Sequence, residues 1–170
     1  MLKYLMILIL SGCPLALAQT NPSADQQKII DIEQQLAATT GSPGEATVKT
    51  FQKYLYDGQD SLVDQFGRHY RMTKADIVGM VGKPDPTDPD AKSVYKVSDF
   101  QIDIYGDTAL ASYSQIATDS GHKNAALDGD TTTTCLDTFI KHSGQWYALA
   151  SSCTPTGPMS QARWDAIAKT

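Results

Sequence analysis

The chain has 170 residues and a formal net charge of −5, from 14 Lys and Arg against 19 Asp and Glu. This acidic balance argues against nucleic acids and anionic membranes as partners, because both are bound through basic patches. The length suits one domain with a hydrophobic core of ordinary size.

The first 18 residues, 1–18, have the anatomy of a secretory signal peptide. Lys3 gives a basic start, residues 4–10 form a short apolar run, and Ala16-Leu17-Ala18 ends the segment as an A-x-A cleavage site. The run is too short to span a bilayer. We therefore expect cleavage after Ala18 and an exported protein, periplasmic or secreted. The alternative is that Leu10-Ser11-Gly12-Cys13 is a bacterial lipobox, in which case a lipid on Cys13 would anchor the protein to a membrane.

A polar tail, residues 19–24, leads into the first two predicted helices. The first is capped by Ser23 or Asp25 and ends at Gly41. Residues 42–45 start the second, which ends near Gly58. Their apolar residues recur at helical spacing: Ile29, Ile30, Ile32, Leu36 and Ala37 in the first, and Val48, Phe51, Tyr54 and Leu55 in the second.

A third helix is predicted over residues 74–81, with Thr73 as its cap and Gly82 as its end. Ahead of it, residues 62–66 predict a short strand or turn. After it, residues 83–90 alternate three prolines with carboxylates, which excludes regular structure. We interpret this stretch as a solvated connector. The other interpretation, a calcium loop, lacks the Gly and Glu spacing of the twelve-residue calcium motif.

Four antiparallel strands are predicted between residues 97 and 154. Phe100, Ile102 and Ile104 alternate with polar residues, and Gly106-Asp107 suits a type II′ turn into a strand that begins at residue 109. The third strand runs from about residue 131 to 141, and the fourth from 146 to 153. Residues 119–130 form a flexible crossing between the two hairpins. Residues 155–170 form a C-terminal extension with a short helix capped by Ser160.

Cys135 and Cys153 lie on the two strands of the last hairpin. An oxidising compartment favours a disulfide between them if the register places them opposite each other. A two-residue turn at Ser143-Gly144 offsets them by one position, and a longer loop or a β-bulge would correct the offset. Otherwise the two cysteines would be small buried apolar residues.

Several short motifs between residues 25 and 154 occur in an order that resembles a known superfamily: Gly67 with Thr73-Lys74-Ala75, Ser98-Asp99-Phe100, Tyr105 to Ala109, and Asp137 to Lys141 with Gly144-Gln145-Trp146 and Ala150-Ser151-Ser152. The layout resembles nuclear transport factor 2-like proteins, in particular an uncharacterised secreted branch related to ketosteroid isomerase and the SnoaL-like polyketide-cyclase proteins. The resemblance implies an α+β fold: a cone-shaped, curved antiparallel sheet of about four main strands, covered by the N-terminal helices and surrounding a pocket. Dimerisation through the outer sheet face is common in such families.

The branch has no agreed activity, so the resemblance implies a fold more firmly than a reaction. The chain departs from the pattern at residues 41–44, where relatives often have one longer helix. It also departs at Ser152 and Cys153, where catalytic relatives often have a His.

The favoured hypothesis is a non-catalytic domain that holds a small apolar or amphipathic ligand in the cone. Small residues on the strands would leave room on a concave sheet. The same residues could instead let helices pack closely on the sheet. These small residues are Ala109, Ala111, Ala148 and Ala150.

The second hypothesis is an enzyme of the isomerase, cyclase or dehydratase kind, with Asp137 as general base and Tyr113 or Tyr54 as hydrogen-bond donor. Asp137 shares a strand face with Cys135 and Phe139. The competing interpretation is that Asp137 belongs to a structural hydrogen-bond network and the tyrosines to the core. The residues expected to line the pocket are Tyr54, Asp57, Ala111, Phe139 and Ala150.

The third hypothesis is a homodimeric assembly module with Trp146 or Tyr147 as anchors on the outer sheet face. No cofactor and no metal is expected, because His69, His122 and His142 lack the paired spacing of metal sites and no phosphate-binding Gly loop is present. We expect His122 and His142 to be exposed.

Overall fold

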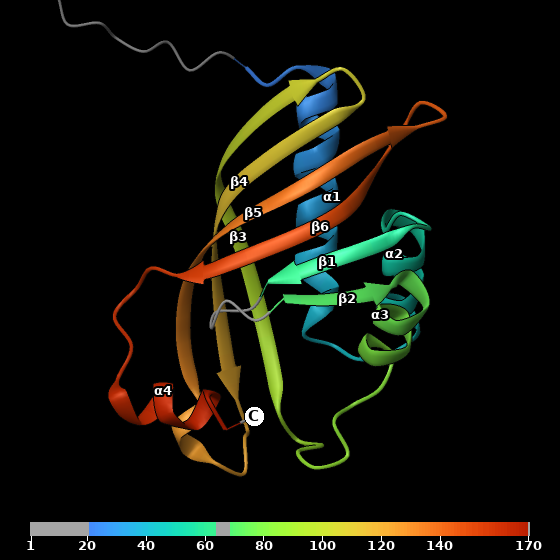
Figure 1. Cartoon of the computed structure of the whole chain (residues 1–170). Coiled ribbons are helices and arrows are strands. Elements are labelled where there is room, and N and C mark those ends of the chain that lie inside the picture. The colour runs from blue at the N-terminus through green and yellow to red at the C-terminus, as the bar shows by residue number, and fades with distance from the viewer. Residues whose placement is uncertain (1–20, 64–68, 170) are drawn as a thin grey trace, which may run out of the picture.

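The computed structural model describes residues 21–63 and 69–169. Within these residues, four helices, one 3-10 turn and six strands follow in the order α1, α2, β1, β2, α3, β3, β4, η1, β5, β6, α4. One sheet, in the order β2-β1-β6-β5-β4-β3, curves beside α1, and α2 and α3 lie near its β1–β2 end (Figure 1). The predicted α+β architecture with a curved antiparallel sheet is confirmed. The proposed signal segment, the lipobox at Cys13, and Phe66 and Gly67 lie outside the described residues.

Helix α1 (Ala24–Thr40) begins as its sequence predicts. The Ser23 side chain accepts a hydrogen bond from the Gln26 backbone N–H, and the Gln26 side chain accepts one from the Ser23 backbone N–H, which together form a capping box. The residues of α1 that are buried against the sheet form one helical stripe. They are Ile29, Ile32, Glu33 and Leu36, so one ionisable residue lies on the apolar face.

The end of α1 lies directly against β3 (Lys92–Tyr105). A Cβ atom on Gly41 would lie 1.6 Å from the Ser93 carbonyl oxygen, so only glycine fits at this position. Helix α2 (Glu45–Tyr54) follows, and the fully buried hydroxyl of Thr47 reaches back to the Thr39 carbonyl oxygen at 2.9 Å. The break between α1 and α2 is therefore a packed turn.

Helix α3 (Lys74–Val81) has the predicted bounds. Thr73 and Asp76 form a capping box at its start, and Gly82 ends it. Among the described helices, none is both long and apolar enough to cross a membrane.

The four predicted strands are the long ones: β3, β4 (Thr108–Ser120), β5 (Gly129–His142) and β6 (Gln145–Pro155), each antiparallel to its neighbour. Strand β3 starts earlier than predicted, and a bulge between Ser98 and Gln101 interrupts its register with β4. The crossing between the hairpins contains η1 (Ala125–Leu127).

Two short strands extend this meander beyond the prediction. β1 (Gln59–Val63) pairs antiparallel with β2 (His69–Thr73) and parallel with β6. Residues 62–63 therefore belong to a strand, and the backbone of His69 begins the next one. β1 and β6 are far apart in the sequence and pair in parallel, so no tight turn joins them. The sequence therefore contains no turn motif that predicts this pairing.

The β3–β4 and β5–β6 hairpin turns each contain a glycine with positive φ. Tyr105 pairs with Thr108 around Gly106, which has φ 63°, as the predicted type II′ turn requires. The β5–β6 turn has positive φ at both Ser143 (51°) and Gly144 (80°).

A bulge between Thr138 and Phe139 then shifts the β5–β6 register by one position, so that Cys135 faces Cys153 directly. The two sulfur atoms are bonded at 2.07 Å. The predicted disulfide is confirmed, and a bulge in this hairpin brings the two cysteines opposite each other.

The core lies between α1, α2, α3 and the concave face of the sheet. Its fully buried large side chains include Ile29, Phe139 and Trp146. Trp146 is only 1% exposed, so it cannot anchor a dimer on the outer sheet face; Tyr147, the alternative anchor, is half-buried, and the dimer stays a prediction. Helix α4 (Gln161–Ile167) is capped by Ser160 as predicted. It packs against η1 near the start of β5, at the end of this strand away from the β5–β6 turn (Figure 1).

Candidate functional site

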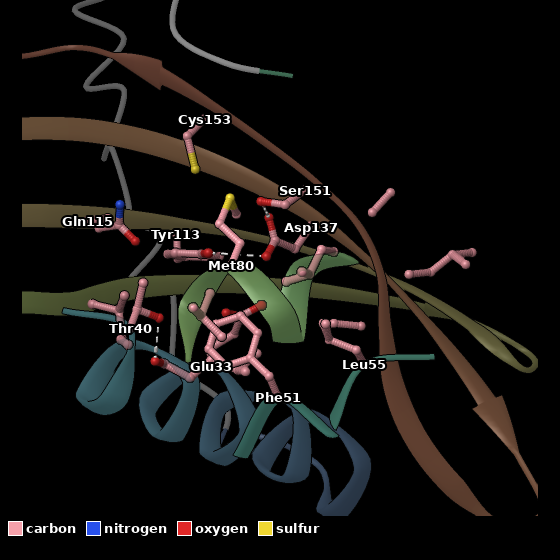
Figure 2. A pocket seen from close by; sticks show the side chains of 18 residues that line it. Glu33, Thr40, Phe51, Leu55, Met80, Tyr113, Gln115, Asp137, Ser151 and Cys153 are labelled. Carbon is pink, nitrogen blue, oxygen red and sulfur yellow. Dashed lines mark hydrogen bonds between the residues drawn. The ribbon is translucent and has the colours of Figure 1, made fainter. Parts of the chain in front are cut away.

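A cavity of about 260 Å³ lies between the helices and the concave face of the sheet (Figure 2). Apolar side chains from α1, α2 and α3 cover it, and strands β3 to β6 form its floor. Met80 of α3 lines the cavity and is 56% exposed, so the cavity reaches the surface there. The residues that the helices and the end of α2 contribute are Glu33, Leu36, Ala37, Thr40, Phe51, Leu55, Ile77, Met80 and Val81.

Asp137 is the centre of a polar cluster on the floor of the cavity. Its side chain is buried, and it accepts hydrogen bonds from Ser151 Oγ at 2.6 Å and from Tyr113 Oη at 3.2 Å (Figure 2). The pleat explains the arrangement, since residues 135, 137 and 139 of β5 all face inward. Asp137 pairs directly with Ser151 across the β5–β6 ladder.

A second carboxyl group, that of Glu33, reaches this cluster from α1. Glu33 is 3% exposed, and its carboxyl interacts with both Asp137 and Tyr113. Its Oε1 atom is buried and has no hydrogen-bond partner among the described residues. The site therefore holds two carboxyl groups in contact inside an apolar cavity.

Burial sets the protonation of this cluster. It raises the pKa of Asp137 to about 6, against the opposing effect of the hydrogen bond from Ser151. Burial and the neighbouring Asp137 raise the pKa of Glu33 well above its usual range. Burial beside these carboxyls also raises the pKa of the Tyr113 phenol, which stays neutral. Because two adjacent buried carboxyls cannot both ionise readily, the pair retains one proton near neutral pH.

The structure places the other predicted pocket residues in four environments. Ala150 lines the cavity. Ala111 and Phe139 are fully buried in the core and are absent from the lining. Tyr54 donates to Gln35 Oε1 at 2.7 Å in a separate surface pocket. Asp57, whose side chain is 91% exposed, pairs with Lys74 in another surface pocket.

Of the four strand alanines, two line the cavity, as the ligand-binding hypothesis expects, and two are buried in the core, as the close-packing alternative expects. Ala148 and Ala150 on β6 line the cavity and leave room there. Ala109 and Ala111 on β4 are fully buried in the same core cluster as Ile29 of α1. One pair therefore enlarges the cavity, whereas the other allows close packing.

Sequence reasoning missed Glu33 and Ser151. Glu33 follows Ile29 by four positions and precedes Leu36 by three, so the signal was a charged residue on an apolar helical stripe. Ser151 carried no such signal, because its partnership with Asp137 depends on the bulge-shifted register.

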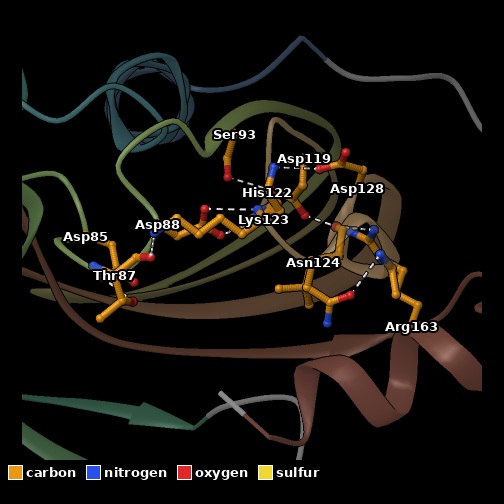
Figure 3. Close-up of polar contacts among 12 residues, drawn as sticks. Asp85, Thr87, Asp88, Ser93, Asp119, His122, Lys123, Asn124, Asp128 and Arg163 are labelled. Carbon is orange, nitrogen blue, oxygen red and sulfur yellow. Dashed lines mark hydrogen bonds and ion pairs between the residues drawn. The ribbon is translucent and has the colours of Figure 1, made fainter.

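His122 lies at the opposite end of the sheet, in a polar network rather than in solvent as predicted (Figure 3). Its Nδ1 is 2.8 Å from Asp88 of the proline-rich loop, and its side chain is 19% exposed. Arg163 of α4 contacts Asp119 at 2.8 Å and the carbonyl oxygens of Leu127 and Gly129. Among the residues that the structure describes, no group of three or more His, Cys, Asp or Glu could hold a metal ion.

A scan against protein-family models found no match to this sequence, and neither did a search of curated proteins. Solved structures do match. A protein from Kribbella flavida is 13% identical with a TM-score of 0.63, over 86% of this chain and 97% of its own. A protein from Streptomyces avermitilis, described as a candidate dehydratase of the NTF2-like family, is 11% identical with a TM-score of 0.60, over 79% of this chain and 97% of its own.

An NTF2-like protein from Cytophaga hutchinsonii is 20% identical with a TM-score of 0.56, over 79% of this chain and 100% of its own. At this level of identity the matches establish the fold and carry no reaction with them. The described part of the chain has the nuclear transport factor 2-like fold that its sequence resembles.

Proposed function

We propose that this protein binds a small, mostly apolar molecule in the cavity between α1 and the sheet. The observation that supports this proposal is the cavity itself: about 260 Å³, lined mainly by apolar side chains, with one polar cluster at Asp137. An apolar protein cavity of about 150 Å³ can bind benzene, so a ligand of roughly ten non-hydrogen atoms is a reasonable size here. The small number of polar groups gathered at Asp137 would orient such a ligand.

Cyclohexylmethanol is a suitable neutral probe, and its binding can be followed by NMR titration of the methyl groups of Leu36, Ile77 and Met80. We expect saturable shifts in these three residues. Ala37→Leu should abolish the shifts, because Ala37 lines the cavity and the larger side chain fills it. Ala38→Leu, on the exposed face of the same helix, is the matched control. Absence of saturable shifts in the unmodified protein would overturn the proposal.

A second candidate function is proton transfer by Asp137, which its pKa of about 6 favours. A general base works best when its pKa lies near the operating pH, and Tyr113 lies 3.2 Å away as a hydrogen-bond donor. The neighbour described as a candidate dehydratase is consistent with this chemistry. Deuterium exchange of the α-protons of cyclohexanone, followed by NMR, tests it. The protein should accelerate exchange and Asp137→Asn should not; equal rates in both would exclude Asp137 as base.

We also infer that the protein is exported, which the disulfide supports, because such bonds persist in oxidising compartments. Mass spectrometry of the mature N-terminus distinguishes the alternatives. A chain that begins at Gln19 indicates signal cleavage, and a lipid-modified Cys13 indicates the lipobox. An intact Met1 would refute both.

A further inference from the structure

The charges around the cavity have one sign. Glu33 and Asp137 line it, and none of the described lining residues is Lys, Arg or His. Two basic side chains elsewhere in the described structure are paired with other carboxylates: Lys141 pairs with Asp25 at 2.7 Å, and Arg163 pairs with Asp119 at 2.8 Å. No cation of the described cavity wall therefore compensates the two carboxyl groups.

The hydrogen-bond donors of the cluster are already used. Ser151 Oγ donates to Asp137 Oδ1 at 2.6 Å, and Tyr113 Oη donates to Asp137 Oδ2 at 3.2 Å. Thr40 Oγ1 donates to the Leu36 carbonyl oxygen at 2.7 Å. Beside Asp137 what remains is acceptor capacity, above all Glu33 Oε1, which belongs to a side chain that is 97% buried and has no hydrogen-bond partner among the described residues. A ligand that carries donors fits this cluster better than one that carries acceptors.

The described elements packed around the pair bring no other ionised group to it. Helix α1 contributes Glu33, β4 contributes Tyr113, and β5 contributes Asp137. Strand β6 contributes Ser151 and the disulfide-bonded Cys153. Helices α2 and α3 contribute only apolar side chains to the lining. A positive charge placed here would act on the two carboxyls in an environment of low dielectric constant, where Coulomb attraction is strong.

We propose that the polar group of the ligand is a protonated amine that binds between Glu33 and Asp137 and displaces the proton held by this pair. The proposal rests on the proposed ligand-binding function and specifies its ligand class as amines with an apolar body. Its proton balance is simple. The ammonium enters with its own protons, its N–H groups donate to the two carboxylates, and one proton leaves the carboxyl pair for solvent. The complex then contains one cation and two carboxylates.

Three probes with the same apolar body and different head groups test this proposal: cyclohexylmethylamine, cyclohexylmethanol and cyclohexanecarboxylate. Titration calorimetry at pH 6, 7 and 8 measures each dissociation constant. We expect the amine to bind most tightly and the carboxylate most weakly. The affinity for the amine should rise with pH by up to about tenfold per unit while one proton is released, whereas the affinity for the alcohol should stay nearly constant.

Buffers with different ionisation enthalpies give the number of protons released, which we expect to approach one for the amine and zero for the alcohol. Glu33→Gln replaces the protonated acid by an amide of the same shape, so it should retain alcohol binding and lose both the amine preference and the proton release. Asp31→Asn removes a carboxylate from the exposed face of the same helix and is the control.

The outcomes separate the two proposals. If none of the three probes binds, the ligand-binding function itself fails. If the alcohol binds and the amine binds no more tightly, only the amine assignment fails. An amine preference that persists in Glu33→Gln and in Asp137→Asn would also overturn it, because the preference would then arise away from the carboxyl pair.

Discussion

The buried carboxyl pair should make this protein less stable as the pH rises through the weakly acidic range. A carboxyl whose pKa is higher in the folded than in the unfolded state keeps its proton longer when folded. Unfolding then releases a proton, and the free energy of unfolding falls between the two pKa values. For Asp137 these values are about 3.8 in the unfolded chain and about 6 in the folded protein.

The magnitude follows from this difference. A pKa difference of about two units corresponds to about 3 kcal/mol, at about 1.4 kcal/mol per unit. Part of this loss has already occurred at pH 4, so about 2 kcal/mol should be lost between pH 4 and pH 7. Glu33, whose pKa is also raised, adds to this loss over the same range and extends the decline to higher pH. Asp25, Asp76 and Asp88 have lowered pKa values, so the stability they contribute is lost only at lower pH.

Urea unfolding at half-unit steps from pH 4 to pH 8, with the disulfide intact, measures this effect. The unmodified protein should lose at least about 2 kcal/mol between pH 4 and pH 7, because the loss from Glu33 adds to that from Asp137. Asp137→Asn removes one of the two titrating carboxyls and should lose about 2 kcal/mol less than the wild type over this range. Its stability relative to the wild type should therefore increase as pH rises. Asp103→Asn, at an exposed position of β3, is the control and should keep the wild-type slope. A wild-type stability that stays constant or rises from pH 5 to pH 7 would refute the assignment of a buried, partly neutral pair.

Three further tests address the scaffold. Gly41→Ala places a methyl group 1.6 Å from a carbonyl oxygen of β3 and should lower the free energy of unfolding by about 3 kcal/mol. By contrast, Gly79→Ala, where a Cβ meets nothing within 4 Å, should raise it by up to about 1 kcal/mol; similar thermal midpoints for the two variants would contradict the close approach of α1 to β3 at Gly41. Reduction of the disulfide should cost about 3 kcal/mol in urea unfolding, and an unchanged midpoint would show that the bond adds no stability. Arg163→Met leaves the Asp119 carboxylate without its cation and should cost about 3 kcal/mol, whereas Lys169→Met at the exposed end of the chain should be nearly neutral.

The local sequence determined the elements whose signals are themselves local. Capping residues at Ser23, Thr73 and Ser160 fixed where three helices begin, because a side-chain oxygen there accepts from the first turn of its own helix. Glycine-marked turns fixed the hairpins, and alternation placed Asp137 and Tyr113 on an inward face. The resemblance to nuclear transport factor 2-like proteins predicted that the sheet is curved and surrounds a pocket.

Tertiary structure alone decided how these elements meet. The parallel pairing of β1 with β6, and the bulge that aligns Cys135 with Cys153 and Asp137 with Ser151, depend on contacts and registers that no local pattern encodes. The packing of α1 across the sheet brings Glu33 against Asp137, residues that are far apart in the chain. Their shared proton exists only because folding removes both carboxyls from water and places them together, which is a property of the assembled cavity and of neither residue alone.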